Sequence, residues 1–338
     1  QWLWLGTSSE HMLEAAANQY WFVILLAPAV GGLIVGVMLQ HCLPNGRAQG
    51  VADVIEARAI GDCKMNTRTG LWSALAAAVT LGFGGSAGRE GPVVHLGATI
   101  ASRLEDMFTL SATTRRTLLA CGVAAAVSAS FNAPIAGVLF AHEVILAHYA
   151  LRAFVPIVLS SVAGALISRI HFGSSAAFII PDYQITSYLE FPAFVLLGVT
   201  CAVVAILFEL SIMITERLSW RFKMPLWLRP ACGGLAVGAI AVFLPQVLGV
   251  GYDATDMALK NQWPLALLLV LIVAKTVATA ITLASRMAGG VFSPALYLGA
   301  MTRSAFGLIA SSAFPEMASS NGLYALLGMG AVAAAVLG

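Results

Sequence analysis

The sequence predicts an all-α polytopic membrane protein, built from two inverted copies of one unit with broken and re-entrant helices. The first observation is composition, since 59% of the 338 residues are hydrophobic and only 10% are charged. Soluble domains carry about 25% charged residues, and a chain this apolar is expected to lie in a lipid bilayer. The formal net charge of +2 gives no reason to expect a nucleic-acid partner. We expect a multi-pass protein of the plasma or inner membrane.

The second observation is a pattern of eleven residues that occurs twice, 202 positions apart, as GREGPVVHLGA at 88–98 and GVFSPALYLGA at 290–300. A second pair keeps the same interval, with PAVGGLIVG at 28–36 and PACGGLAVG at 230–238. Two landmarks with one offset indicate a duplicated unit. We expect the first repeat to cover 1–190 and the second to cover 191–338, truncated before its last helices.

Apolar segments predict the helices in chain order, at 20–40, 71–83, 92–104, 117–128, 132–149, 152–170, 191–213, 225–244, 263–285, 291–313 and 322–338. Several are shorter than the roughly 20 residues that cross a hydrocarbon core. Such helices break within the membrane, where irregular backbone must be buried in protein or line a wet cavity. The Pro-Ala-x-Gly-Gly copies lie on the first and eighth segments, and the second copy is inverted if all seven segments from the first through the seventh cross the membrane fully. The polar stretch 171–190 is expected to connect the repeats.

Glu90 is the strongest candidate for a functional side chain. It stands at a predicted helix start between Gly88 and Gly91, and Pro92 suits the first turn of a helix. A helix amino terminus carries about half a positive charge and binds anions through its free amides. A carboxylate at this place competes with an anion for the same amides and leaves when it is protonated. A plain capping glutamate is the alternative, but a charge at the bilayer centre costs about 2.5–3.5 kcal/mol.

The second copy places Phe292 where the first has Glu90. The free amides of Val291 and Phe292 therefore present a second positive helix end. Two such ends that meet from opposite leaflets form one anion site near the midplane, and a simple helix start is the alternative. Arg89 either attracts anions or pairs with a carboxylate or carbonyl at the helix boundary.

Other polar residues in apolar segments carry less information. Lys275 is an intramembrane cation, for which a functional role, a buried partner and snorkelling are all open. His95 and His142 lack partners at metal-ligand spacing, so packing is the expected role and neither a metal nor a cofactor is predicted. An intramembrane enzyme needs a nucleophile with a base, or a metal motif such as HExxH, and the sequence has neither. A packing scaffold leaves Glu90 and the duplicated helix entries unexplained.

Three motifs together resemble the CLC family of chloride channels and proton-coupled chloride exchangers. They are GREGP at 88–92, FNAPIAGVLF at 131–140 and GVFSP at 290–294, and the likeness runs from about residue 28 to the end. The resemblance implies a homodimer, with an anion pathway and two inverted halves in each subunit. It also implies that Glu90 is the gating glutamate and that the amides of Val291 and Phe292 bind the central anion. We expect Arg89 and Gly91 to complete the anion-binding set with the loop described next.

Two departures from the family pattern concern the choice of ion. The family motif Gly-Ser-Gly-Ile-Pro-Glu is replaced by residues 48–53, so Gln49, followed by Gly50, takes the place of the anion-contacting Ser. The amide of Gln49 can donate to an anion as a hydroxyl does, which leaves nitrate or another anion open beside chloride. Retention of Pro92 argues against fluoride.

The other departure concerns protons. Val144 stands where similar exchangers carry an inner glutamate, which favours a passive chloride channel over a chloride/proton antiporter. Glu143 or His142 could act as a substitute proton site, although neighbouring residues on a helix lie about 100° apart. The family's anion-contacting Tyr is expected on a helix that follows Gly338.

Overall fold

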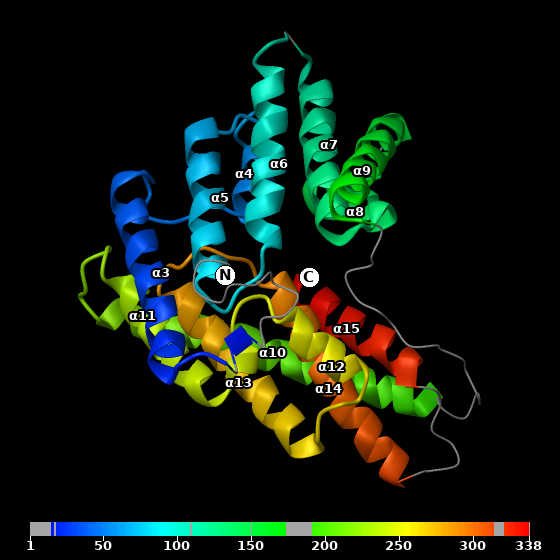
Figure 1. Ribbon diagram of the computed structural model, residues 1–338. Helices are drawn as coiled ribbons and strands as arrows, with labels where there is room; N and C mark the ends of the chain where they lie inside the picture. The colour runs from blue at the N-terminus through cyan, green and yellow to red at the C-terminus, as the bar shows by residue number, and fades with distance from the viewer. Residues whose placement is uncertain are drawn as a thin grey trace.

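The computed structural model describes residues 15–16, 18–108, 110–149, 151–173, 191–313 and 321–337. The described chain folds into helices joined by short loops, and the predicted all-α membrane architecture is confirmed (Figure 1). In the first repeat the helices are α3 (Trp21–His41), α4 (Val51–Ala59), α5 (Thr67–Gly82), α6 (Glu90–Glu105), α7 (Ala112–Phe131), α8 (Pro134–Phe140) and α9 (Leu151–Phe172). In the second they are α10 (Phe191–Arg221), α11 (Arg229–Phe243), α12 (Tyr252–Leu259), α13 (Leu265–Ala284), α14 (Phe292–Ala313) and α15 (Asn321–Leu337).

The apolar segments locate the long helices but miss two short ones. Helices α4 and α12 are only partly apolar, with acidic residues in their first turns, so hydropathy alone does not mark them. The segment 132–149 is divided into α8 and a π-helical turn over Ala141–Leu146. The expected connection at 171–190 begins too early, because His171 and Phe172 close α9. Residues 174–190, where we placed the repeat boundary, lie outside the described residues.

The two repeats pack on each other through equivalent residues. Helix α3 lies beside α11 (Figure 1). A Cβ on Gly32 would overlap the carbonyl of Pro230, and a Cβ on Gly234 would overlap the carbonyl of Pro28. Pro28 and Pro230 are 202 positions apart, as are Gly32 and Gly234. The two contacts are therefore reciprocal, as a local twofold axis between the repeats requires. Small residues permit this close approach of helix backbones in a membrane, where the hydrophobic effect contributes little to helix association.

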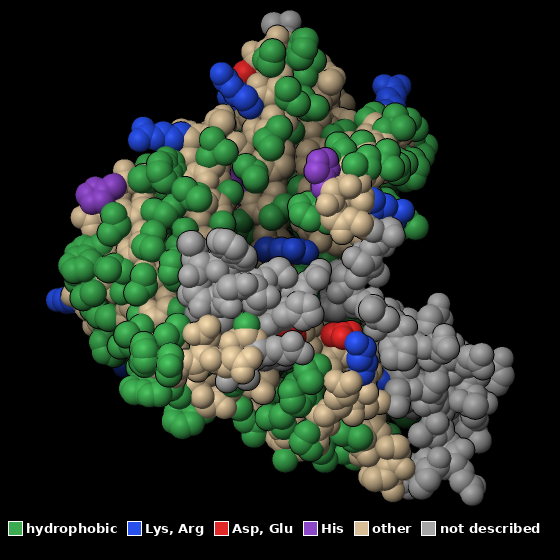
Figure 2. Space-filling view, viewed as in Figure 1, with side chains coloured by type: hydrophobic (Ala, Val, Ile, Leu, Met, Phe, Trp, Pro, Cys, Tyr) green, Lys and Arg blue, Asp and Glu red, His purple; other side chains and the backbone are tan. Residues whose placement is uncertain are grey.

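The helix lengths fit a membrane protein with interrupted spans. Four helices are long and apolar enough to cross a bilayer, namely α3, α9, α10 and α13. Hydrophobic side chains cover much of the face in Figure 2, which also has a hollow near its centre where a basic group is visible. Helices α6 and α14 both begin in the interior, so the chain turns inside the protein at two equivalent places. These broken helices meet at the candidate site.

Candidate functional site

The amino-terminal ends of α6 and α14 are joined by the first glycine of each repeated pattern. The backbone N–H of Gly88 donates to the carbonyl of Gly290, and the N–H of Gly290 donates back to Gly88, each at 2.7 Å. These two residues form an isolated antiparallel bridge. A Cβ on Gly88 would lie 3.1 Å from the Gly290 carbonyl oxygen, so a larger side chain would crowd the contact. The bridge fixes both helix starts at one point between the repeats.

Glu90 is buried at this point, with only 6% of its surface exposed. Its carboxylate does not face solvent but reaches the first turn of α14 from the other repeat. The backbone N–H of Ser293 donates to Glu90 Oε2 at 3.3 Å, and Ser293 Oγ donates to Glu90 Oε1. A negative charge at a helix amino terminus is stabilised by the free amides and the helix dipole. The structure therefore places the Glu90 carboxylate where an anion would be attracted.

Three further backbone amides remain available beside the carboxylate. The backbone N–H groups of Gly91, Val291 and Phe292 donate to no backbone or side-chain acceptor among the described residues. Gly91 lies against Gly290, where a Cβ would be 3.6 Å from the Gly290 Cα. The ring of Phe292 meets that of Phe131 edge to face at 5.4 Å. Amides of both repeats thus lie close together at the bridge between Gly88 and Gly290, with the Arg89 side chain nearby.

The loop with Gln49 and Gly50 is held firmly at the start of α4. The carboxylate of Asp53 accepts from the N–H of Gly50 at 2.8 Å and from both terminal nitrogens of Arg47, at 2.6 and 3.1 Å. The N–H of Gln49 donates to Ser73 Oγ at 3.0 Å. No hydrogen bond joins Gln49 to Glu90 or to the start of α14 in the part of the chain that the structure describes. The side-chain amide of Gln49 is therefore not engaged by Glu90.

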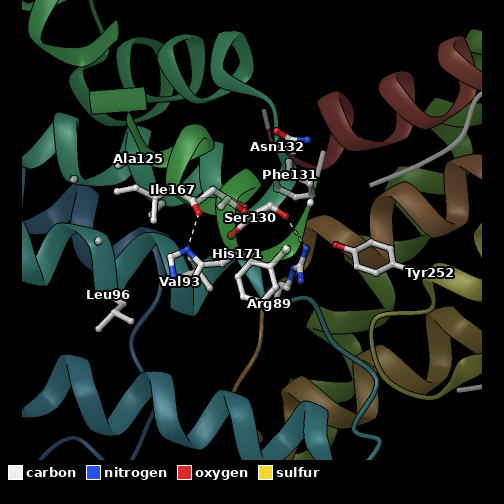
Figure 3. Close-up of a pocket in the computed structure, with 18 of the residues that line it drawn as sticks. Arg89, Val93, Leu96, Ala125, Ser130, Phe131, Asn132, Ile167, His171 and Tyr252 are labelled. Atoms are coloured by element: carbon white, nitrogen blue, oxygen red, sulfur yellow. Dashed lines mark hydrogen bonds between the residues drawn. The ribbon is translucent and has the colours of Figure 1, made fainter. Parts of the chain in front are cut away.

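Arg89 pairs with a carbonyl, one of the two alternatives expected from the sequence. Its Nη2 donates to the carbonyl of Ser130 at 2.6 Å, and the guanidinium lies over the ring of Tyr252, 5.2 Å from the centroid (Figure 3). Arg89 and Tyr252 line a cavity of about 1930 Å³ between α6, α7 and α9 of one repeat and α12 of the other. Arg89 thus lines this cavity beside Glu90, and Tyr252 is a neighbour that the sequence analysis did not identify.

The signal that could have identified Tyr252 is the repeat interval. The loop that supplies Gln49 and Gly50 has its counterpart 202 positions later in Gly251 and Tyr252. Both loops lead into a short helix, α4 or α12, so equivalent loops approach the site from the two repeats.

Neither of the two candidate proton residues is hydrogen-bonded to Glu90 in the described part of the chain. Glu143 is exposed on the π-helical turn, and His142 is buried with its ring stacked on Tyr149 and Phe154. Val144 packs against an apolar cluster that includes Ile145. As expected from helical geometry, Glu143 and Val144 face different surroundings, so the carboxylate does not occupy the place of the inner glutamate.

Lys275 is buried inside the second repeat, which excludes snorkelling. Its ammonium donates to the carbonyls of Val247 and Gly249, at 3.0 and 2.8 Å, and lies 5.1 Å from the centroid of the Tyr297 ring. The lysine thereby fixes the loop that leads to α12. Among the described residues, no group of three or more His, Cys, Asp or Glu side chains is placed to hold a metal ion.

Comparisons with known proteins agree with this architecture. The family model described as voltage gated chloride channel matches residues 31–338. The chain is 33% identical to the putative chloride channel protein ClcB-like of Ralstonia nicotianae, over 99% of this chain and 79% of that protein. It is 32% identical to the H(+)/Cl(-) exchange transporter ClcA of Vibrio cholerae, over 76% of this chain and 56% of that protein. It spans about half the length of two plant relatives, 48% and 46%.

The fold also matches solved structures. A slow cyanobacterial Cl-/H+ antiporter superposes with a TM-score of 0.83 at 22% identity, covering 98% of this chain and 79% of that one. At this identity the likeness is one of fold, and it supports the arrangement of two inverted repeats with broken helices.

Proposed function

Because the chain belongs to the voltage-gated chloride channel family, we propose that it conducts chloride across a membrane through a site between the starts of α6 and α14, gated by Glu90. The single observation that supports this assignment is the carboxylate of Glu90 at the amino terminus of α14, where Ser293 donates to it twice. The carboxylate takes the place of an anion. Its protonation or displacement would leave the amides of Gly91, Val291 and Phe292 to the permeating ion.

Partial charges suit conduction better than a fixed cation would. A pore must attract an ion strongly enough to enter and weakly enough to leave. Helix ends and free amides provide a moderate field, while Arg89 is engaged with Ser130 and Tyr252. Gln49 would add a donor from the α4 loop, so nitrate is the second anion that this site could carry.

We favour a passive channel because Val144 stands where similar exchangers carry an inner glutamate. This valine packs in an apolar cluster. Chloride/proton exchange is the second candidate, since one relative of this chain is named an H(+)/Cl(-) exchange transporter. Exchange in this chain would need a proton route through other groups, and Glu143 and His142 are the candidates on that side.

The experiment is chloride efflux from liposomes containing the purified protein, with chloride and pH electrodes read together. Chloride efflux that outpaces empty liposomes, with no coupled proton movement, supports a channel. Proton uptake driven uphill by a chloride gradient establishes exchange instead. Absence of any anion flux from protein that remains monodisperse would refute anion transport.

We also propose a homodimer in the plasma or inner membrane, with one anion pathway in each subunit. Helix α9 presents many exposed apolar side chains, including Leu159, Leu166 and Ile170, to lipid or to a second copy. Cross-linking in native membranes would distinguish a dimer from a monomer.

A further inference from the structure

The end of α10 carries basic and aromatic side chains that the proposed anion pathway does not use. Residues 217–229, which we call the basic turn, contain four cations and no carboxylate. They cover the last turns of α10, the turn that follows and the first residue of α11, at the outer edge of the molecule (Figure 1). The charged and aromatic residues of the basic turn are Arg217, Trp220, Arg221, Phe222, Lys223, Trp227 and Arg229.

The cations of the basic turn have no acidic partners in the described part of the chain. Glu216 directly precedes them but forms no ion pair with any of them. The ion pairs among the described residues hold other cations, namely Arg47, Arg103, Arg115 and Lys260. Arg217, Arg221 and Lys223 are exposed, so their charges are available to an anionic partner.

A fifth cation reaches the basic turn from α13. The guanidinium of Arg286, just beyond the end of α13, lies 5.7 Å from the centroid of the Trp220 ring. Arg229 donates to the hydroxyl of Ser219, which is a neutral group. Two helices of the second repeat and the turn between α10 and α11 thus gather positive charge at one surface.

The length of α10 places this surface among the lipid headgroups. Its 31 residues span about 46 Å at about 1.5 Å per residue, whereas the hydrocarbon core is about 30 Å thick. The first turns of α10 are apolar and its last turns are charged, so the carboxyl-terminal end extends out of the core. Trp220 and Trp227 are 64% and 41% exposed, as expected of aromatic residues at a membrane interface.

We propose that the basic turn, with Arg286, binds the phosphate headgroups of anionic phospholipids. A phospholipid fits better than an acidic protein, because the exposed apolar residues Leu210, Met213 and Ile214 precede the cations on the same helix and can contact acyl chains. Basic residues at the end of a membrane helix attract anionic lipids of the cytoplasmic leaflet. Lipid binding at this turn does not depend on the proposed anion transport and can be measured without it.

The first test uses quenching of tryptophan fluorescence by brominated lipids in phosphatidylcholine liposomes. Brominated phosphatidylglycerol should quench more strongly than the same fraction of brominated phosphatidylcholine. The double variant Arg221→Gln with Lys223→Gln should weaken this preference by about fivefold for each cation removed. Arg103→Gln is the matched control, because Arg103 is exposed but already paired with Asp106, and it should leave the preference unchanged.

The second test locates the lipid. Trp220→Phe with Trp227→Phe keeps aromatic rings at the interface and should remove most of the quenching that is selective for phosphatidylglycerol. Inorganic phosphate at millimolar concentration distinguishes a lipid site from a simple anion site, since it should leave the preference intact.

Three results would overturn the lipid site. The first is equal quenching by the two brominated lipids in the wild type. The second is a preference that the cation variants leave unchanged, or that persists without Trp220 and Trp227, because the lipid would then bind elsewhere. The third is displacement of phosphatidylglycerol by inorganic phosphate, which would assign the turn to free anions.

Discussion

The carboxylate of Glu90 accepts a hydrogen bond from the backbone N–H of Ser293, a residue 203 positions later in the chain and on the opposite repeat. The contact joins the only acidic residue of the first helix entry to the free amides of the second. Each repeat alone would have half of this arrangement. The candidate site is thus a product of the packing between the repeats.

Glu90→Gln should abolish pH-dependent gating while anion flux persists. In the wild type, flux should rise as the pH falls, because the protonated carboxyl no longer competes with chloride for the amides of α14. Gln mimics the protonated side chain, so its flux should be high and flat with pH. Chloride efflux recorded across a pH series measures both, with Glu216→Gln on α10 as the exposed control. A Glu90→Gln variant that keeps the wild-type pH profile would contradict the gating role.

Gln49→Ser should shift selectivity from nitrate toward chloride. The amide of Gln49 offers two N–H donors to a planar anion, whereas a hydroxyl offers one donor to a spherical ion. The backbone of the loop should be preserved, because Asp53 and Ser73 hold it through the main chain. The ratio of nitrate to chloride flux in liposomes is the measurement. An unchanged ratio would show that Gln49 does not contact the permeating anion.

Gly32→Ala and Gly234→Ala should each lower thermal stability, because the new Cβ would overlap a carbonyl of the facing helix. Overpacking of this kind costs about 1–3 kcal/mol. Gly198→Ala is the matched control within α10, since a Cβ there meets nothing within 4 Å. Thermal unfolding in detergent compares the three variants. Similar unfolding temperatures for all three would mean that the contact between α3 and α11 does not limit stability.

Lys275→Met should loosen the loop before α12. The substitution removes the donor that satisfies the carbonyls of Val247 and Gly249, and unsatisfied buried carbonyls cost about 1–3 kcal/mol each. Hydrogen exchange of the peptide covering 245–251 should accelerate, and the amide of Gly249, which donates to Gly84, should lose protection. Lys223→Met, in an exposed loop, should not change this exchange. Unaltered protection in Lys275→Met would assign the lysine another role.

Sequence periodicity and the repeat interval predicted most of the fold, because long apolar runs and paired glycines mark the helices and their contacts directly. Helices α4 and α12 were missed because their acidic first turns interrupt the apolar pattern. At the site, the starts of α6 and α14 were predicted as two positive helix ends that meet at one anion site, with Glu90 at the first of them. Their direct contact through Ser293 was not, since no local pattern shows which residue of one repeat a side chain of the other will reach.

Tyr252 shows why part of the site escapes a sequence argument. Nothing in its own sequence neighbourhood indicates that it lies beside Glu90 and Arg89, because an aromatic residue at a helix start is common in a membrane protein. Its place in the site is indicated by the repeat interval that aligns it with Gly50. It is also indicated by the contact of its ring with the Arg89 guanidinium, which only the folded chain shows. A side chain that differs between two repeats is therefore a useful place to search for function.

The distance along the chain between Glu90 and Ser293 has a consequence for biosynthesis. Ribosomes add about 5–20 residues per second, so the 203 positions that separate the two residues correspond to about 10–40 s of translation. Throughout that interval the newly inserted first half contains the Glu90 carboxylate and the backbone of Gly88. Their hydrogen-bond partners, Ser293 and Gly290, have not yet been synthesised. Chains released early would carry this incomplete surface into the bilayer, where a membrane quality-control protease could recognise them.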